Sequence, residues 1–186
     1  MKHVLSHGDY MGIKNLARKL IYCPHFSPKK MPFTLHVVKT HDEFKYYVKR
    51  LIEGRFGVLC EVEKEVVLPG GEKGFVDLVC HGKERSIIAE VKSFNYLRAD
   101  NVLSDLMQLL LYAYAYIQKY GKDEVSIDLF LVYKDFDGKP LFIKLNKDSM
   151  YVNFNIENEK TVTGNYRYVS PLCTFCSSQC SFKVNS

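Results

Sequence analysis

The chain has 186 residues, of which 47% are hydrophobic and 25% are charged. This length and balance are typical of one globular domain with its own core. No apolar run is long enough to cross a bilayer, and the N-terminal residues lack a signal-peptide pattern, so we expect an intracellular, cytoplasmic protein without a membrane partner. The net charge of +5 permits a polyanionic partner without requiring one.

Hydrophobic periodicity and turn residues predict the elements in chain order. A short basic helix is expected over residues 15–21, and Thr40 and Glu43 match a capping box that predicts a helix from Thr40 to about Gly54. The elements expected after it are strands over 59–68, 75–80 and 86–93, a helix over 100–120, and strands over 125–133 and 140–145. This order predicts an α/β fold with a mixed central sheet flanked by helices.

No repeat or low-complexity linker divides the chain, so we expect a single domain over 1–186. Its parts are an N-terminal segment over 1–39, a core over 40–148 and a polar tail over 149–186.

Two carboxylates and a lysine interrupt the apolar strands at 75–80 and 86–93. Asp77 and Glu90 lie equally far from the middle of the polar turn between these strands, so a regular hairpin would place their Cβ atoms roughly 5 Å apart. Lys92 projects from the same face as Glu90. A solvated charge ladder is the alternative, but both strands are otherwise apolar on both faces, and buried carboxylates need a partner. The pattern therefore favours a divalent-metal site.

Three polar residues of the expected helices are further candidates. His41 falls on the apolar stripe of the helix at 40–54, where a core or capping histidine is the alternative to a ligand. Gln108 and Tyr112 lie four residues apart on one helix face, and the alternative is a buried pair that satisfies its own hydrogen bonds.

The six cysteines fall into two groups. Cys60 and Cys80 lie in apolar strand-like runs, so we expect buried structural thiols. Three clustered cysteines in an intracellular protein suggest a metal centre before disulfides, and a fourth ligand is then needed. The clustered residues are Cys173, Cys176 and Cys180, and the candidates for the fourth ligand are Cys23 and, as runner-up, His25.

The order of these motifs resembles the PD-(D/E)XK nuclease superfamily. Asp77, Glu90-Val-Lys92 and Gln108-Leu-Leu-Leu-Tyr112 follow one another at short separations, and Gly74 precedes Asp77 by three residues. With one cysteine before this core and three after it, the chain is similar to the RecB-type branch that carries an iron–sulfur cluster. That branch includes AddB-type nucleases and CRISPR-associated RecB-like exonucleases, among them homologues from archaeal viruses.

The resemblance implies a restriction-endonuclease-like core and a role for each motif residue. Mg²⁺ or Mn²⁺ would be held by His41, Asp77, Glu90 and the main-chain carbonyl of Val91. Lys92 would orient the attacking water and stabilise charge, and the QxxxY motif of Gln108 and Tyr112 would support the lysine and the DNA strand. A 4Fe-4S cluster would be held by Cys23, Cys173, Cys176 and Cys180.

Two departures from the family pattern leave alternatives open. Val76 stands where many members have proline, and the last two cysteines are closer together than is usual, which keeps Zn²⁺ as an alternative to iron–sulfur.

The expected function is therefore metal-dependent hydrolysis of DNA phosphodiester bonds. We expect a single-stranded DNA exonuclease, with endonuclease activity as a second mode, acting alone, as a homo-oligomer or within a larger DNA-processing complex. The alternative from another class is a non-catalytic nucleic-acid-binding or assembly subunit with a structural iron–sulfur or zinc centre. A zinc-stapled interaction module is a third, but it would leave Asp77, Glu90 and Lys92 without a reason.

Overall fold

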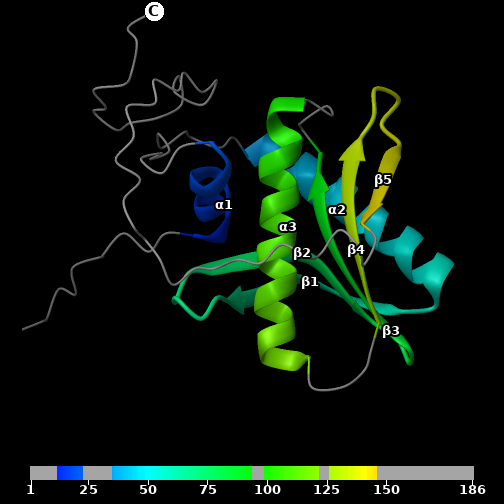
Figure 1. Ribbon diagram of the computed structural model, residues 1–186. Helices are drawn as coiled ribbons and strands as arrows, with labels where there is room; N and C mark the ends of the chain where they lie inside the picture. The colour runs from blue at the N-terminus through cyan, green and yellow to red at the C-terminus, as the bar shows by residue number, and fades with distance from the viewer. Residues whose placement is uncertain (1–11, 23–34, 94–98, 122–125, 146–186) are drawn as a thin grey trace, which may run out of the picture.

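The computed structural model describes residues 12–22, 35–93, 99–121 and 126–145 (Figure 1). The elements are α1 (Ile13–Ile21), α2 (Leu35–Phe56), β1 (Leu59–Val67), β2 (Lys73–His81), β3 (Arg85–Lys92), α3 (Ala99–Tyr120), β4 (Ser126–Lys134) and β5 (Pro140–Leu145). Within these ranges, no helix has the length and apolar character that crossing a membrane requires.

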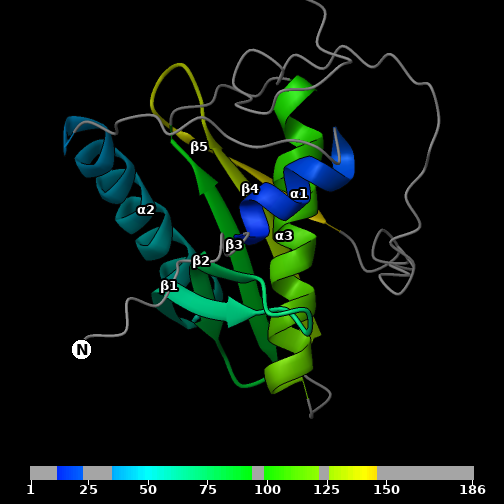
Figure 2. The same cartoon turned by 90° about the vertical axis from the view of Figure 1, so that its left-hand side faces the viewer.

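The five strands form one sheet in the order β1-β2-β3-β4-β5. Only β3 and β4 are parallel, and α3 connects them, as a parallel pair requires a crossover. Figure 2 shows α2 on one face of the sheet and α1 with α3 on the other. The predicted α/β fold with a mixed sheet flanked by helices is confirmed. The assignment of the whole chain to one domain, cysteine-bearing tail included, reaches beyond the described residues and stays a prediction.

Each face of the sheet has its own core. On β3, Ile88 packs with the buried residues of α1 and α3, whereas its neighbours Ile87 and Ala89 pack with those of α2. A strand covered on both faces needs apolar side chains in both phases, which is why β3 reads as a nearly continuous hydrophobic run. Glu90 and Lys92 share the phase of Ile88 and therefore lie on the α1/α3 face.

The start of α2 differs from the prediction. The helix begins at Leu35, so Thr40 lies inside it and the predicted N-cap is wrong. The helical backbone continues through the residues before Thr40. Inside a helix the backbone amides are already bonded, so the capping motif has no free amide to bind. At the other end Gly57, with φ 62°, donates its N–H to the Glu53 carbonyl, so the helix ends two residues later than expected.

The two core cysteines form a disulfide. Cys60 and Cys80 are directly opposite each other in the β1–β2 ladder, with their Cα atoms 3.8 Å apart, and the structure joins their sulfur atoms. Both residues are buried as expected, but the prediction that they are free thiols is wrong, because their sulfur atoms are bonded to each other. The cross-strand register brings the side chains together, and the sequence pattern alone did not reveal that register.

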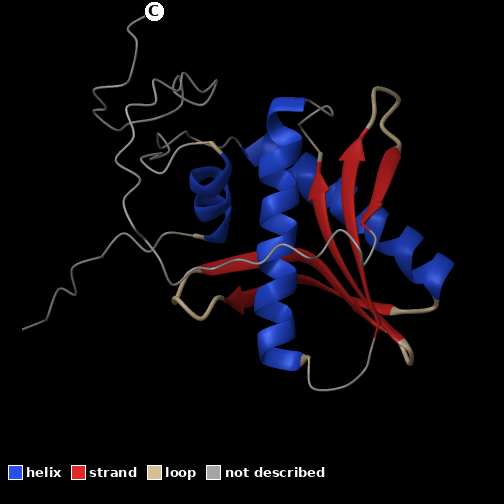
Figure 3. Cartoon of the chain, in the orientation of Figure 1, coloured by secondary structure: helices blue, strands red, loops and turns tan. Residues whose placement is uncertain are grey.

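The β1–β2 hairpin parts from the rest of the sheet at Asp77. Pairing of β2 with β3 runs from His81↔Ser86 to Leu78↔Ala89 and then stops. Figures 1 and 3 show β1 and β2 crossing α3 while β3, β4 and β5 rise in another direction. On β1, Glu63 has φ 54° and lies in a gap of the β1–β2 ladder opposite Asp77. This divergence opens the sheet at the predicted site.

Candidate functional site

Asp77 lies where β2 separates from β3. Its Oδ2 atom accepts a hydrogen bond of 2.8 Å from the backbone N–H of Val91, so the carboxylate takes up an amide of the neighbouring strand just beyond the ladder's end. The hairpin register follows the prediction as far as Leu78↔Ala89, one step before Asp77 and Glu90. Asp77 and Glu90 therefore contribute to the site from neighbouring strands, but they are not ladder partners, as they would be in a regular hairpin.

Lys92 is the hub of a buried network on the α3 side of the sheet. Its Nζ atom lies 2.7 Å from Oε1 of Glu90, 3.1 Å from Oε1 of Gln108 and 3.3 Å from Oδ1 of Asp105. These three acceptors match the three protons of an ammonium group. Burial opposes the charged form of Lys92, but attraction to Glu90 and Asp105 outweighs it and raises its pKa. Lys92 is therefore a fixed cation and not a base.

Gln108 and Tyr112 of α3 face the strands, as predicted. The Gln108 amide donates to Glu90 Oε1 at 2.7 Å and to the Tyr112 hydroxyl at 3.0 Å. The pair is thus bonded to itself, as the buried-pair alternative held, and also to the carboxylate and lysine of the site. Gly74 allows this approach, because a Cβ atom there would lie 2.6 Å from the Tyr112 ring.

The environments of Asp77 and Glu90 drive their pKa values apart. Burial, followed by repulsion from Asp77, raises the pKa of Glu90 to about 7. Burial also acts against ionisation of Asp77, but the close approach of His41 and attraction to Lys92 outweigh it and lower its pKa. Glu90 Oε2 is buried and has no hydrogen-bond partner in the described part of the chain. Pairs of carboxyl groups whose pKa values are driven apart by their surroundings are typical of catalytic and ligand-binding sites.

Helix α2 adds His41 from the other side of the opening. Its Nδ1 atom is 2.8 Å from Ser93 Oγ, and its Nε2 atom is 3.7 Å from Asp77 Oδ1. The prediction that His41 points inward is confirmed, and the side chain approaches the carboxylate of Asp77. One turn later on the same helix, Lys45 is 1% exposed and bonded to Glu63 and Asp42. Burial opposes its charged form, but these two contacts, followed by attraction to Asp77, outweigh it and raise the pKa of Lys45.

Several residues of this network were not singled out from the sequence. Asp105 lies three residues before Gln108, on the same face of α3, and it accepts a hydrogen bond of 2.8 Å from the Tyr133 hydroxyl. Helical spacing from Gln108 and from His41 would have pointed to Asp105 and Lys45. No sequence pattern pointed to Tyr133, because its place in the network depends on the parallel pairing of β3 with β4.

The donors present suit a hard divalent cation. An unpartnered carboxylate oxygen of Glu90, the Asp77 carboxylate and an imidazole nitrogen are ligands that Mg²⁺ or Mn²⁺ accepts. The described residues contain no group of three or more His, Cys, Asp or Glu side chains already gathered as a metal site. Val91 uses its N–H for Asp77, and a ligand role for its carbonyl stays a prediction.

The proposed cysteine centre lies outside the described residues. That holds for Cys23, Cys173, Cys176 and Cys180, and for His25 as the runner-up ligand. The choice between a 4Fe-4S cluster and Zn²⁺ stays a prediction.

No protein-family model matches the chain, and no curated protein matches it. Among solved structures, one similar chain is described as "Crystal structure of SSO0001", with 17% sequence identity and a TM-score of 0.43 over 82% of this chain and 73% of that one.

Proposed function

We propose that this protein is a metal-dependent nuclease that hydrolyses phosphodiester bonds in DNA, with single strands as the preferred substrate. The observation that carries the proposal is the buried network in which Glu90, Lys92 and Gln108 bond to one another, while Glu90 Oε2 has no hydrogen-bond partner among the described residues and Glu90 feels the charge of Asp77. A network built only for stability would be expected to satisfy that oxygen, because a buried acceptor without a partner costs about 1–3 kcal/mol.

Asp77, Glu90 and His41 are the residues that would hold Mg²⁺ or Mn²⁺. The ion, when bound, would lower the pKa of a water molecule and neutralise charge on the scissile phosphate. The two carboxylates would provide the negative charge that such an ion needs, and Glu90 Oε2 has no hydrogen-bond partner of its own among the described residues.

Lys92 would act as a fixed positive charge and not as a proton acceptor. Its hydrogen bonds to Glu90 and Gln108 and its ion pair with Asp105 hold the ammonium group in place, and its raised pKa keeps it protonated at neutral pH. A preorganised cation in a water-poor site stabilises negative charge that develops on a phosphate oxygen. Gln108 sets the position of both partners, because one amide bonds to Glu90 and Lys92 together.

The substrate preference belongs to the same proposal. Exonuclease action on single strands and endonuclease action as a second mode rest on the resemblance to RecB-type nucleases, and a cytoplasmic location rests on the expectation of an intracellular protein drawn from the sequence. An iron–sulfur or zinc centre in the cysteine-bearing segments would be structural and separate from the hydrolytic ion.

The test is incubation of purified protein with end-labelled single- and double-stranded DNA, with Mn²⁺ or with EDTA. We expect shortening of the single strand with Mn²⁺ and none with EDTA. Single-strand binding without cleavage under any divalent ion would instead favour the non-catalytic subunit.

A further inference from the structure

Two hollows lie between α2 and the β4–β5 hairpin. The first has a volume of about 440 Å³ and is lined by Thr40, Ser93, Lys134 and the turn that follows β4. It opens beside the candidate site, because Ser93 Oγ is bonded to His41 Nδ1. The second has a volume of about 670 Å³ and lies between the last turns of α2 and the middle of β4 and β5. Helix α2 is therefore a wall shared by the site and both hollows.

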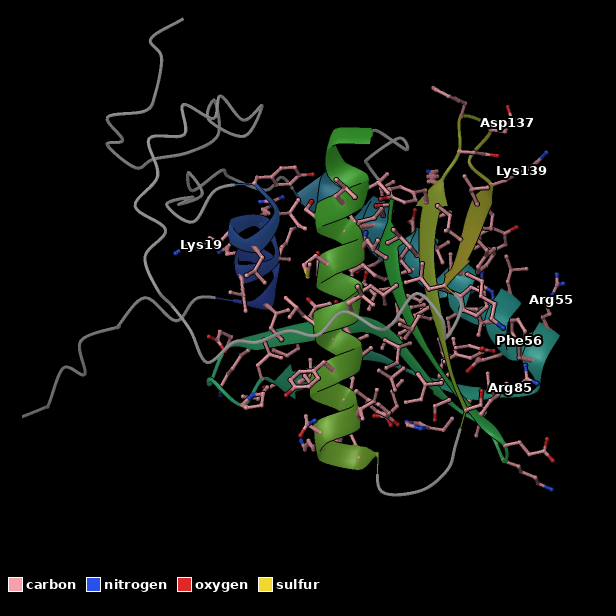
Figure 4. All side chains as sticks on the ribbon, in the orientation of Figure 1. Lys19, Arg55, Phe56, Arg85, Asp137 and Lys139 are labelled. Carbon is pink, nitrogen blue, oxygen red and sulfur yellow. A yellow bond between two sulfur atoms is a disulfide. The ribbon has the colours of Figure 1, made fainter. Side chains whose placement is uncertain are left out.

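The second hollow has an aromatic floor. The ring of Phe130 is 5.8 Å from that of Phe56 and meets that of Phe142 edge-on at 6.0 Å. Phe142 is 37% exposed and lines the hollow, so part of its ring is accessible from it. The guanidinium groups of Arg55 and Arg85 lie 5.9 Å and 6.0 Å from the Phe56 ring centroid. Figure 4 shows Arg55, Phe56 and Arg85 close together at this end of the molecule.

The charged residues that line this hollow are all cationic: Arg50, Arg55 and Lys144. The nearby carboxylate of Asp128 is already occupied, at 2.8 Å by Lys144 and at 3.6 Å by Arg85. The first hollow contains Asp135 and Asp137, but the Asp135 carboxylate accepts the Lys139 N–H within its own turn. The second hollow therefore favours a polyanion that carries flat apolar groups.

We propose that a single strand of nucleic acid lies in this aromatic groove, with a base on Phe142 and phosphates beside Arg50 and Arg55. Aromatic rings flanked by arginines and lysines are the usual platform for single strands. The rise of 1.5 Å per residue places Arg50 and Arg55 about 14 Å and 21 Å along α2 from His41. The groove would thus hold the strand a few nucleotides from the cleaved bond. The inference rests on the proposed function for the identity of the strand as substrate.

The test is fluorescence anisotropy of a labelled 20-nucleotide single strand, measured with EDTA so that no cleavage occurs. Phe142→Leu keeps an apolar side chain and removes the ring, so we expect affinity to fall about 5-fold or more. Arg55→Gln should also weaken binding and reduce the slope of log affinity against log salt by about 0.7. The matched control is Lys19→Gln, which removes one charge on α1 at the opposite side of the molecule (Figure 4) and should change affinity less than 2-fold.

Each outcome separates the groove from the nuclease activity. Unchanged affinity and salt slope in both variants would overturn the inference, as would failure of the unaltered protein to bind the single strand. If Phe142→Leu lowers the melting temperature but leaves DNA affinity unchanged, the Phe142 ring serves the fold and not the strand. That result would also overturn the inference. Groove-dependent binding without Mn²⁺-dependent cleavage would sustain the inference and refute the nuclease. Because Arg55 is exposed, its variant tests the groove even where Phe142→Leu folds poorly.

Discussion

Replacing Glu90 by Gln should stabilise the metal-free protein at alkaline pH. The side chain keeps its shape and loses only its ability to ionise. Glu90 has a folded-state pKa of about 7, raised from 4.5 mainly by burial and by repulsion from Asp77. A carboxyl group with a raised folded pKa contributes its full stability below about pH 4.5 and loses it as the pH rises through 7.

The size of the effect follows from the pKa difference. The difference between a pKa of 4.5 and one of about 7 corresponds to roughly 3 kcal/mol of stability between pH 4 and pH 8. Groups that do not interact with Glu90 titrate alike in both proteins and cancel in the comparison. Glu90→Gln should therefore match the unaltered protein at pH 4 and exceed its free energy of unfolding by roughly 3 kcal/mol at pH 8.

The assay is urea unfolding of both proteins at pH 4 and pH 8 with EDTA. Glu65→Gln is the matched control, since this half-exposed β1 carboxylate pairs only loosely with Lys73, at 3.7 Å. Mn²⁺ added at pH 8 should stabilise the unaltered protein more than Glu90→Gln, because binding to the folded state adds to stability. A Gln variant that is less stable at pH 8, or a difference that does not change with pH, would refute the reasoning.

Further predictions concern the rest of the network and the cysteines. Tyr112→Phe should lower cleavage while costing only about 1 kcal/mol of stability; a loss of several kcal/mol with normal activity would mark a purely structural residue. Lys92→Met should abolish cleavage and, by leaving buried acids without their cation, cost about 3–5 kcal/mol in urea unfolding. Replacing both Cys60 and Cys80 by Ala should lower the free energy of unfolding by about 3 kcal/mol, and alkylation of both before reduction would disprove the disulfide. Anaerobic protein should be brown and contain iron, and Cys173→Ser should bleach it; a colourless protein with one equivalent of zinc would replace the cluster by zinc.

The strands and the long helix were predictable because local pattern and tertiary context agree. The turn between β2 and β3 and the apolar runs beside it set the hairpin register, which the structure keeps up to Leu78↔Ala89. Gly121, which donates to the Ile117 carbonyl, ends α3 where expected. The start of α2 was missed, because the Thr40 capping motif competes with helix-forming residues upstream, and local sequence cannot rank the two.

The site was predictable only in part. Acids in apolar strands stand out, so Asp77, Glu90 and Lys92 could be found from the sequence, and helical spacing added Gln108 and Tyr112. The divergence of β2 from β3 could not be read from the sequence, since it depends on how the hairpin twists over α3, and it decides that Asp77 bonds to a backbone amide. The same holds for the Cys60–Cys80 bond, which requires knowing which residues of β1 and β2 are opposite.

The most direct measurement of the proposed function is the Mn²⁺-dependent cleavage rate of single-stranded DNA for the unaltered protein, Glu90→Gln and Glu65→Gln side by side. Each protein would first be shown to be folded by its circular dichroism and melting temperature. We expect the unaltered protein and Glu65→Gln to cleave at similar rates and Glu90→Gln to lose cleavage, because one lost carboxylate removes the oxygen left open for the ion. Undiminished cleavage by Glu90→Gln would contradict the assignment of the site.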